Sequence, residues 1–210
     1  MREQDSLGRR ERRMALTRAQ LIDAAVRLCL EQGYEQTTVS QIADAVGVSE
    51  RTFARYFPAK ETVLLALVDD LTAAVADEMT RIPPEVPALG ALRDAHLAVL
   101  GRVRSGGVPG LTVGGIAQLL RVLNAAPELR ASALTTRLGI SAVIAARTGA
   151  PPGHRDHELV AWAWAAITAA ASGDHEEHEA ATPLGPELFA ERLDGAYRLF
   201  TGLAAGIAQP

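Results

Sequence analysis

Residues 33–61 read GYEQTTVSQIADAVGVSERTFARYFPAKE, and this stretch decides the fold of the N-terminal part of the chain. Thr38 and Gln41 form the Thr-x-x-Gln pattern of a capping box, which starts a helix, and Gly47 is suited to end that helix about two turns later. Ser49 then caps a second short helix. Two short helices joined by a glycine-containing turn of about three or four residues predict a helix-turn-helix pair.

A preceding helix completes this small domain. Thr17 and Gln20 repeat the capping-box pattern, and Gly33 supplies a stop signal. Short helices cannot bury their apolar faces alone, so the helix from Thr17 must cover both of them. Phe53 and Phe57, four residues apart, form a ridge that we expect to face it. Apolar residues of this first helix recur at helical spacing and are expected in the core: Leu21, Ile22, Ala25, Leu28 and Cys29.

The remainder of the chain is predicted to be helical. A long helix starts at Lys60 and ends before Pro83, because proline interrupts helical hydrogen bonding. The glycine-rich residues 106–115 lack the GK[ST] ending of a phosphate loop and are interpreted as a connector. No alternating strand pattern of useful length occurs, so the predicted fold class is all-α with about nine helices. Five further helices are expected, at residues 88–104, 111–126, 127–148, 156–172 and 186–208.

Composition excludes several classes of protein. The 210 residues are 48% hydrophobic and 22% charged, as in an ordinary soluble globular protein. Residues 1–13 hold five arginines and no apolar run, which argues against a signal peptide. No stretch reaches about 18 uninterrupted apolar residues, so we expect no membrane span and a cytoplasmic location. Cys29 is the single cysteine, which excludes an internal disulfide and a cysteine-built metal site.

The charge is distributed unevenly along the chain. Residues 1–60 carry ten basic and eight acidic residues, whereas residues 61–210 carry eleven and seventeen. Residues 1–16 alternate charges without apolar periodicity, which predicts a flexible basic arm that either reaches DNA or stays solvated. We therefore expect three segments: the arm at 1–16, a helix-turn-helix domain at 17–60, and a second helical domain at 61–210.

The quoted stretch resembles the DNA-binding segment of the TetR family of transcriptional regulators. The resemblance covers Thr17 to Lys60, and the only lysine of the chain stands where the family pattern has one. The chain departs from that pattern at Ala54, where tyrosine is often found, and at Ala59, where a capping serine or asparagine is common. The residues in register are Gly33-Tyr34, Thr38-Val39, Ile42-Ala43, Ala45-x-Gly47-Val48-Ser49, Thr52-Phe53, Tyr56-Phe57 and Lys60-Glu61.

The resemblance implies a homodimeric repressor, with a DNA-binding domain at 17–60 and a ligand-binding and dimerisation domain at 61–210. Such a protein binds a palindromic operator in double-stranded DNA, dimerises through its last two helices, and releases the operator when a small molecule occupies its second domain. An activator, or an architectural dimer without a ligand, is the alternative among DNA-binding proteins, and a sealed second domain would favour the latter. An enzyme or a helical interaction protein is the alternative from another class. No G-x-S-x-G, phosphate loop, HExxH or pair of catalytic carboxylates occurs, so no catalytic residue and no cofactor are predicted.

The residues predicted to contact DNA lie on and around the second helix of the pair. The major groove admits an α-helix with its N-terminal residues at the base edges. Arg51 and Arg55 share one face, and an arginine fork matches guanine, whereas Glu50 either accepts from cytosine or orients Arg51. Helix N-termini, hydroxyls and positive charge favour phosphate. The complete set is Thr38, Ser49, Glu50, Arg51, Thr52, Arg55, Tyr56 and Lys60.

Each of the expected phosphate contacts has a structural alternative. Capping alone explains Thr38 and Ser49, packing explains Tyr56, and a solvated ammonium explains Lys60.

In the domain at 61–210, a pocket lined by apolar side chains favours an apolar ligand. Polar residues inside its apolar stretches are the pocket candidates, although each can instead make a structural hydrogen bond or face solvent: His96, Gln118, Arg121 and Asn124.

The last two predicted helices carry unusually large apolar surfaces. Residues 159–171, LVAWAWAAITAAA, are apolar almost all the way round, and the helix at 186–208 has a wide apolar face. Pairing with a second copy into a four-helix bundle would bury both, and packing within one chain is the alternative. His175 and His178, between these helices, have an H-x-x-H spacing but lie among acids in a predicted loop, so no metal site is predicted there.

Overall fold

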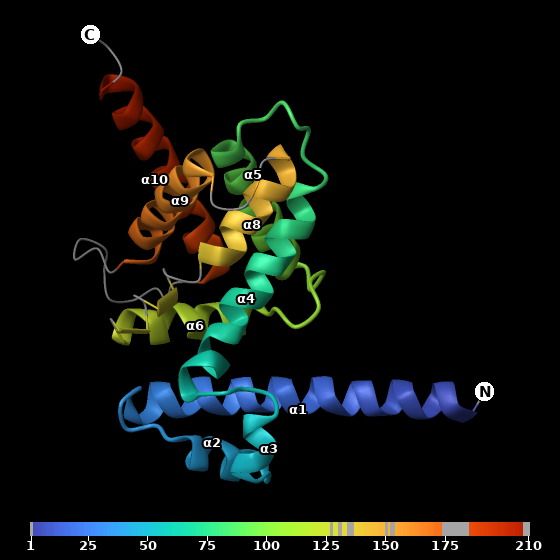
Figure 1. Cartoon of the computed structure of the whole chain (residues 1–210). Coiled ribbons are helices and arrows are strands. Elements are labelled where there is room, and N and C mark those ends of the chain that lie inside the picture. The colour runs from blue at the N-terminus through green and yellow to red at the C-terminus, as the bar shows by residue number, and fades with distance from the viewer. Residues whose placement is uncertain are drawn as a thin grey trace. The chain divides into compact units, whose positions relative to one another are not determined.

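The computed structural model of the chain is helical in the part that it describes: residues 2–126, 128–129, 132–133, 137–149, 151, 154–173 and 185–207. Nine helices and no strand occur in these residues, which confirms the predicted all-α class (Figure 1). The chain divides into two compact units, Met1–Leu67 and Val68–Pro210. Their boundary lies inside one helix, seven residues after the predicted one. None of the helices in the described ranges is long and apolar enough to cross a membrane.

The N-terminal unit is built around its first helix. It contains α1 (Arg2–Gln32), α2 (Val39–Val46), α3 (Glu50–Ala54) and the start of α4 (Lys60–Met79). The helix α1 packs on α2, and α2 packs on α3. The ring centres of Phe53 and Phe57 lie 5.8 Å apart, and both side chains are buried as predicted. Cys29 is also buried in this core.

Local capping signals set the helix-turn-helix pair. The backbone N–H of Gln41 donates to Oγ1 of Thr38 at 3.2 Å, and the N–H of Thr38 donates to Oε1 of Gln41 at 2.9 Å, so the predicted capping box forms. Oγ of Ser49 accepts from the N–H of Thr52 at 3.2 Å and caps α3. Gly47 ends α2 with φ of 72°, in the left-handed region that favours glycine.

The structure differs from the predicted N-terminal arm. The helix α1 begins at Arg2 instead of Thr17, so residues 2–16 are helical and Thr17 lies inside the helix without a capping role. Residues 9–16, RRERRMAL, consist entirely of good helix formers. Charge alternation without apolar periodicity excludes a buried face, but it does not exclude a helix exposed to solvent.

The start of α4 uses a cap from within the helix. At position 59, where the family pattern often has a capping residue, the chain has Ala59. Oγ1 of Thr62 accepts a hydrogen bond from the N–H of Ala59 at 3.2 Å and donates to its carbonyl at 2.7 Å. Thr62 therefore supplies half of a capping box from the first turn and compensates for the alanine.

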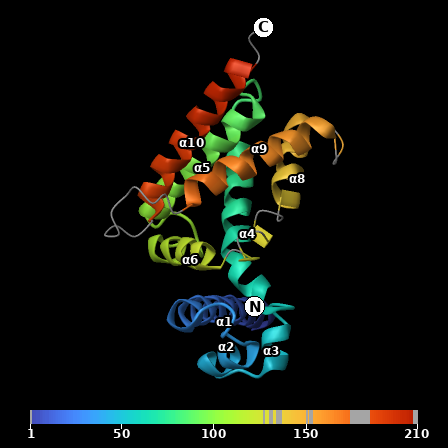
Figure 2. The ribbon, with the colours of Figure 1, turned by 90° about the vertical axis from the view of Figure 1, so that its left-hand side faces the viewer.

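In its described residues, the C-terminal unit contains five helices with defined bounds besides the rest of α4. The helix α9 packs against α10, α8 and α5, and α10 also lies along α5 (Figure 2). The connector between α5 and α6 ends at Thr112, which caps α6, so residues 113–115 of the predicted connector belong to the helix. Within the helix predicted at 127–148, residues 128–129 and 132–133 are helical and α8 begins at Arg137, whereas residues 127, 130–131 and 134–136 lie outside the described part. The helices are α5 (Ala88–Arg104), α6 (Val113–Ala125), α8 (Arg137–Thr148), α9 (Arg155–Ser172) and α10 (Pro186–Ile207). His175 and His178 also lie outside the described residues.

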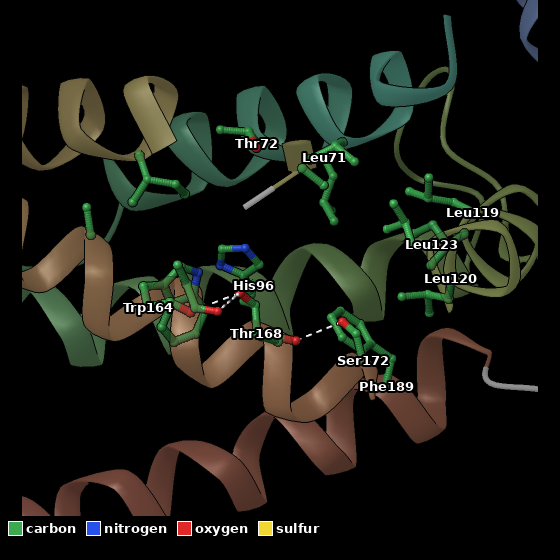
Figure 3. A pocket seen from close by; sticks show the side chains of 17 residues that line it. Leu71, Thr72, His96, Leu119, Leu120, Leu123, Trp164, Thr168, Ser172 and Phe189 are labelled. Carbon is green, nitrogen blue, oxygen red and sulfur yellow. Dashed lines mark hydrogen bonds between the residues drawn. The ribbon is translucent and has the colours of Figure 1, made fainter. Parts of the chain in front are cut away.

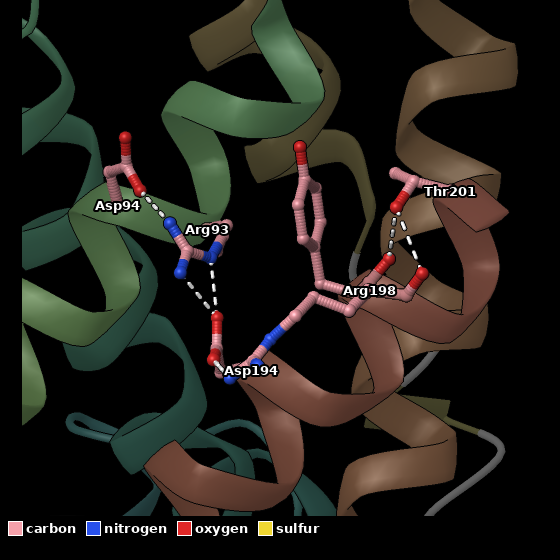
Figure 4. A network of polar contacts seen from close by, with 6 residues as sticks. Arg93, Asp94, Asp194, Arg198 and Thr201 are labelled. Atoms are coloured by element: carbon pink, nitrogen blue, oxygen red, sulfur yellow. Dashed lines mark hydrogen bonds and ion pairs between the residues drawn. The ribbon is translucent and has the colours of Figure 1, made fainter.

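Two arginines connect the elements of this unit. Nε of Arg93 on α5 donates to Oδ1 of Asp194 on α10 at 2.6 Å, and Arg198 also pairs with Asp194 (Figure 4). Hydrogen bonding by Arg198 and Arg93 holds the pKa of Asp194 below its usual value. Arg147 on α8 donates to four backbone carbonyls in and after the last turn of α4: Met79, Ile82, Pro83 and Val86. These contacts fix α10 against α5 and the end of α4 against α8.

Candidate DNA interface and ligand cavity

The short helix α3 presents a charged face to solvent. Phe53 is 1% exposed and anchors α3 in the core, whereas Glu50 and Arg51 are exposed. Arg55 follows the last residue of α3 with φ of −74° and ψ of −24°, so it continues the helical path. Arg55 is exposed as well. The structure therefore brings the three predicted base-contacting residues to the surface of one element.

The predicted phosphate-contacting residues surround this element. Thr38 and Ser49 are exposed, and Thr52 and Tyr56 are half-buried. Both Thr38 and Ser49 act as helix caps, and Oγ of Ser49 lies 3.0 Å from Oγ1 of Thr52. Capping thus explains Thr38 and Ser49 in the absence of DNA. Their contacts with phosphate stay predictions.

Lys60 has a defined structural partner in this unit. Its Nζ donates a hydrogen bond to the carbonyl of Tyr34 at 2.7 Å and lies 4.0 Å from the centre of the Tyr34 ring. Lys60 is half-buried, so the alternative of a fully solvated ammonium does not apply. Burial raises the pKa of the nearby Cys29 thiol, while a hydrogen bond with Thr37 and the charge of Lys60 act in the opposite direction. Sequence reasoning missed Tyr34 as the partner, although Gly33-Tyr34 stood in the matching pattern.

A cavity of about 140 Å³ lies inside the C-terminal unit. Seventeen residues from α4, α5, α6, α8, α9, α10 and the segment before α8 line it, and none of them carries a formal charge (Figure 3). Most of the lining is aliphatic, with Leu119, Leu120 and Leu123 of α6 on one side. Its polar side chains are few: Thr72, His96, Trp164, Thr168 and Ser172.

His96 is the predicted pocket residue that the structure places in this lining. Its Nδ1 lies 2.8 Å from the carbonyl oxygen of Leu92. Because a carbonyl only accepts, Nδ1 carries the proton and Nε2 keeps a lone pair. Burial lowers the pKa of His96 to about 4, against the opposing effect of the Leu92 hydrogen bond, so the imidazole is neutral at pH 7.

Trp164 packs against His96 at the same place. The two ring centres are 4.7 Å apart with an interplanar angle of 49°. Trp164 is 2% exposed, and its buried Nε1 has no hydrogen-bond partner among the residues that the structure describes. One turn along α9, the hydroxyl of Thr168 donates to the carbonyl of Trp164 at 2.9 Å. Sequence reasoning missed Trp164, because an all-round apolar helix does not reveal whether Trp162 or Trp164 points inward.

The other three predicted pocket residues do not line this cavity. Gln118 and Arg121 are exposed, and Asn124 is half-buried with an Oδ1 that has no partner in the described part of the chain. The reason is the helical period of α6. Its inward stripe follows the 3.6-residue repeat and leaves Gln118 and Arg121 on the opposite face: Ile116, Leu119, Leu120 and Leu123.

Comparison with known sequences identifies the N-terminal unit. Residues 21–67 match the family model described as bacterial regulatory proteins, tetR family. The HTH-type transcriptional regulator TcmR of Streptomyces glaucescens is 39% identical over 148 residues, which cover 68% of this chain and 65% of TcmR. The fatty acid metabolism regulator protein of Bacillus subtilis (strain 168) is 40% identical over 60 residues, 29% of this chain and 31% of that protein. The matches thus span less than two thirds of each of these relatives.

A solved structure extends the likeness in fold to both units. The fatty acid degradation regulator FadR from Bacillus halodurans superposes with a TM-score of 0.50 and 21% identity, covering 89% of this chain and 95% of FadR. At that identity the likeness concerns the fold alone. The family match at residues 21–67 includes the helix-turn-helix pair, α2 and α3, and both of its N-caps. Residues 21–67 of the chain therefore belong to the tetR family of bacterial regulatory proteins.

Proposed function

We propose that the protein is a sequence-specific DNA-binding transcriptional regulator. More closely, we infer a homodimeric repressor that leaves a palindromic operator when a small ligand occupies the cavity. The observation that carries the proposal is the exposed face of Glu50, Arg51 and Arg55, which lies opposite the buried Phe53. A helix anchored on one side by an aromatic residue can present its other side to the major groove without unfolding the domain.

The exposed residues divide into two roles on DNA. Arg51 and Arg55 read base edges, because a guanidinium fork matches the acceptors of guanine. Residues around α3 contact phosphate and set the register without reading sequence. The exposed arginines of α1 extend this set, because positive charge attracts the DNA backbone irrespective of sequence. The phosphate set comprises Thr38, Ser49, Thr52, Tyr56, Lys60, Arg10, Arg12 and Arg13.

Dimerisation through α9 and α10 accounts for their exposed leucines. Leu159 is 59% exposed on α9, and Leu199 and Leu203 are 65% and 61% exposed on α10. Large apolar side chains left exposed on these two helices would be buried at an interface, and a two-fold dimer brings the same surface of each copy together. Two helices from each copy make a four-helix bundle, the arrangement that the apolar sequence of α9 favours. A two-fold dimer in turn requires a palindromic operator.

Ligand control follows from the cavity. The helix α4 begins in the N-terminal unit and lines the cavity with Leu71 and Thr72, so it connects the two sites covalently. Some conformers of the dimer hold its two DNA-binding domains at the wrong spacing for the two half-sites. A ligand that prefers such a conformer lowers the affinity for DNA, and DNA lowers the affinity for the ligand by the same factor. The cavity favours this mechanism over an architectural dimer without a ligand. Such a regulator is not an enzyme, and it acts in the cytoplasm, where the chromosome is.

The test is selection of bound fragments from a random duplex pool, followed by fluorescence anisotropy titration of the winning sequence. We expect a two-fold symmetric motif and an affinity that falls steeply with salt. Arg55→Ala should relax base preference at one position in each half-site. Arg27→Ala is the control, because Arg27 is an exposed arginine of the same unit that pairs with Glu31. Enrichment of no motif by protein free of bound small molecules would refute the proposal.

A further inference from the structure

We propose that the cavity selects uncharged ligands carrying a hydroxyl group, which accepts a hydrogen bond from Nε1 of Trp164 and donates one to Nε2 of His96. The inference rests on the proposed function, in which this cavity is the ligand site, and it adds the chemistry of the ligand. Three features of the described part of the cavity carry it: a buried indole N–H without a partner, a neighbouring imidazole whose Nδ1–H is already bonded to a carbonyl, and a lining without charge.

The donor is the indole N–H of Trp164. The side chain is 2% exposed, and Nε1 is buried without a hydrogen-bond partner in the described ranges. A buried donor that has lost its water without gaining a protein acceptor is costly, and such groups are rare in folded proteins. A ligand oxygen in the cavity supplies the missing acceptor. Binding is then favoured by a hydrogen bond that the empty protein lacks.

The acceptor is Nε2 of His96. Its Nδ1–H is held by the carbonyl of Leu92, which fixes the tautomer and leaves Nε2 with its lone pair. The imidazole packs against the Trp164 ring at 4.7 Å between ring centres, so the donor and the acceptor lie at the same end of the cavity (Figure 3). A hydroxyl satisfies both, because it is at once a donor and an acceptor. An ether or a ketone satisfies only Trp164.

The uncharged lining excludes ionised ligands. Among the residues that the structure describes, none that lines the cavity is Asp, Glu, Lys or Arg, and His96 is neutral at pH 7. A carboxylate placed here would be buried without a cation to pair with, which is strongly unfavourable. The rest of the ligand must be apolar, because aliphatic side chains and Phe189 form most of the remaining wall.

The size of the cavity determines the probe. At about 140 Å³ it is close to the roughly 150 Å³ apolar cavity that is known to hold benzene. A single six-membered ring with one substituent is therefore the matching size. Phenol carries the hydroxyl, toluene has the same shape without it, and benzoate carries a charge. These three compounds differ in the polar group alone, at nearly constant ring size.

The experiment is isothermal titration calorimetry of the full-length protein at pH 7 with each of the three compounds. We expect phenol to bind at least about tenfold more tightly than toluene, as one net hydrogen bond allows, and benzoate to give no measurable binding. Trp164→Phe removes the N–H and keeps an aromatic ring, so the preference for phenol over toluene should shrink to what the bond to Nε2 of His96 alone provides, while toluene binding is unaffected. Trp162→Phe is the matched control, because Trp162 is 57% exposed and does not line the cavity.

The opposite results are equally specific. Equal affinities of phenol and toluene for the wild type, binding of benzoate, or an undiminished phenol preference in a folded Trp164→Phe protein would each overturn the inference. Failure of all three compounds to bind would overturn it too. His96→Phe provides a second variant and should also reduce the preference for phenol, and the double variant should abolish it. Because the readout is direct binding, the proposed control of DNA is tested separately: phenol that binds without displacing the operator leaves this inference intact and refutes ligand release.

Discussion

The ammonium group of Lys60 donates to the carbonyl oxygen of Tyr34 at 2.7 Å and lies 4.0 Å from the centre of the Tyr34 ring. This contact joins the first residue of α4 to the turn after α1, 26 residues earlier in the chain. A compact ammonium can donate to the carbonyl and face the ring at once. The single lysine of the chain therefore has a structural task besides its proposed contact with phosphate.

Lys60→Met should destabilise the N-terminal unit. Methionine keeps an unbranched apolar stem but loses a charged hydrogen bond and a cation–π contact, which together contribute about 2 kcal/mol. The free energy of unfolding from urea denaturation should fall by about that amount. Arg27→Met is the control, because its exposed pair with Glu31 is worth about 0–1 kcal/mol. An unchanged urea midpoint for Lys60→Met would mean that the contact with Tyr34 contributes nothing to stability.

Thr38→Ala should separate the capping role of this residue from its proposed contact with DNA. Loss of the cap costs about 1 kcal/mol, since the hydroxyl that accepts from the N–H of Gln41 disappears, whereas the backbone N–H of residue 38 can still donate to Oε1 of Gln41. Thr38→Ser keeps the hydroxyl and should retain most of that stability. If Thr38 also contacts phosphate, operator affinity measured well below the unfolding temperature should drop in Thr38→Ala and be kept in Thr38→Ser. Equal affinities of both variants would restrict Thr38 to capping.

The sequence predicts the N-terminal unit well because its signals are local. Each cap acts within three residues, as Thr38 and Ser49 illustrate, so no knowledge of the rest of the fold is needed. The helicity of residues 2–16 was missed because charge alternation was interpreted as disorder, whereas the propensity of the same residues favours a helix. Apolar periodicity thus predicts buried helical faces but not exposed ones.

The cavity was harder to predict because its lining depends on tertiary packing. Polar residues were chosen within apolar stretches, and only His96 proved to line it, whereas Gln118 lies on the outer face of α6. Trp162 and Trp164 are two residues apart in a helix that is apolar all round, so apolar periodicity does not indicate which of them points into the unit. The partners of Arg147 lie 61 to 68 residues away, beyond the reach of any local pattern.

Arg147 should be required for the stability of the C-terminal unit. Its guanidinium donates to the carbonyls of Met79, Ile82, Pro83 and Val86, which follow or end α4. Arg147→Met should lower the free energy of unfolding by about 3 kcal/mol and speed amide hydrogen exchange in residues 80–88. Arg147→Lys should recover less than half, because an ammonium cannot reproduce a planar fork.

The control for Arg147 is Arg155→Met, since Arg155 is exposed at the start of α9. The free energy of unfolding of the Arg155→Met protein should remain within about 0.5 kcal/mol of the wild type. If Arg147→Met leaves hydrogen exchange in residues 80–88 unchanged, the segment after α4 is held by other contacts and the assigned role of Arg147 is wrong.

His96 should make the protein sensitive to acid. Burial lowers its pKa to about 4 in the folded state, whereas the unfolded chain has the ordinary value of 6.5. Between these values the unfolded state binds more protons, so the stability present above pH 6.5 is lost as the pH falls toward 4. The loss amounts to roughly 3 kcal/mol. His96→Phe removes this titration and keeps a buried ring. Urea denaturation at intervals from pH 7.5 to 4 should therefore show a steeper decline for the wild type than for His96→Phe, and parallel curves would show that His96 does not change its proton occupancy on unfolding.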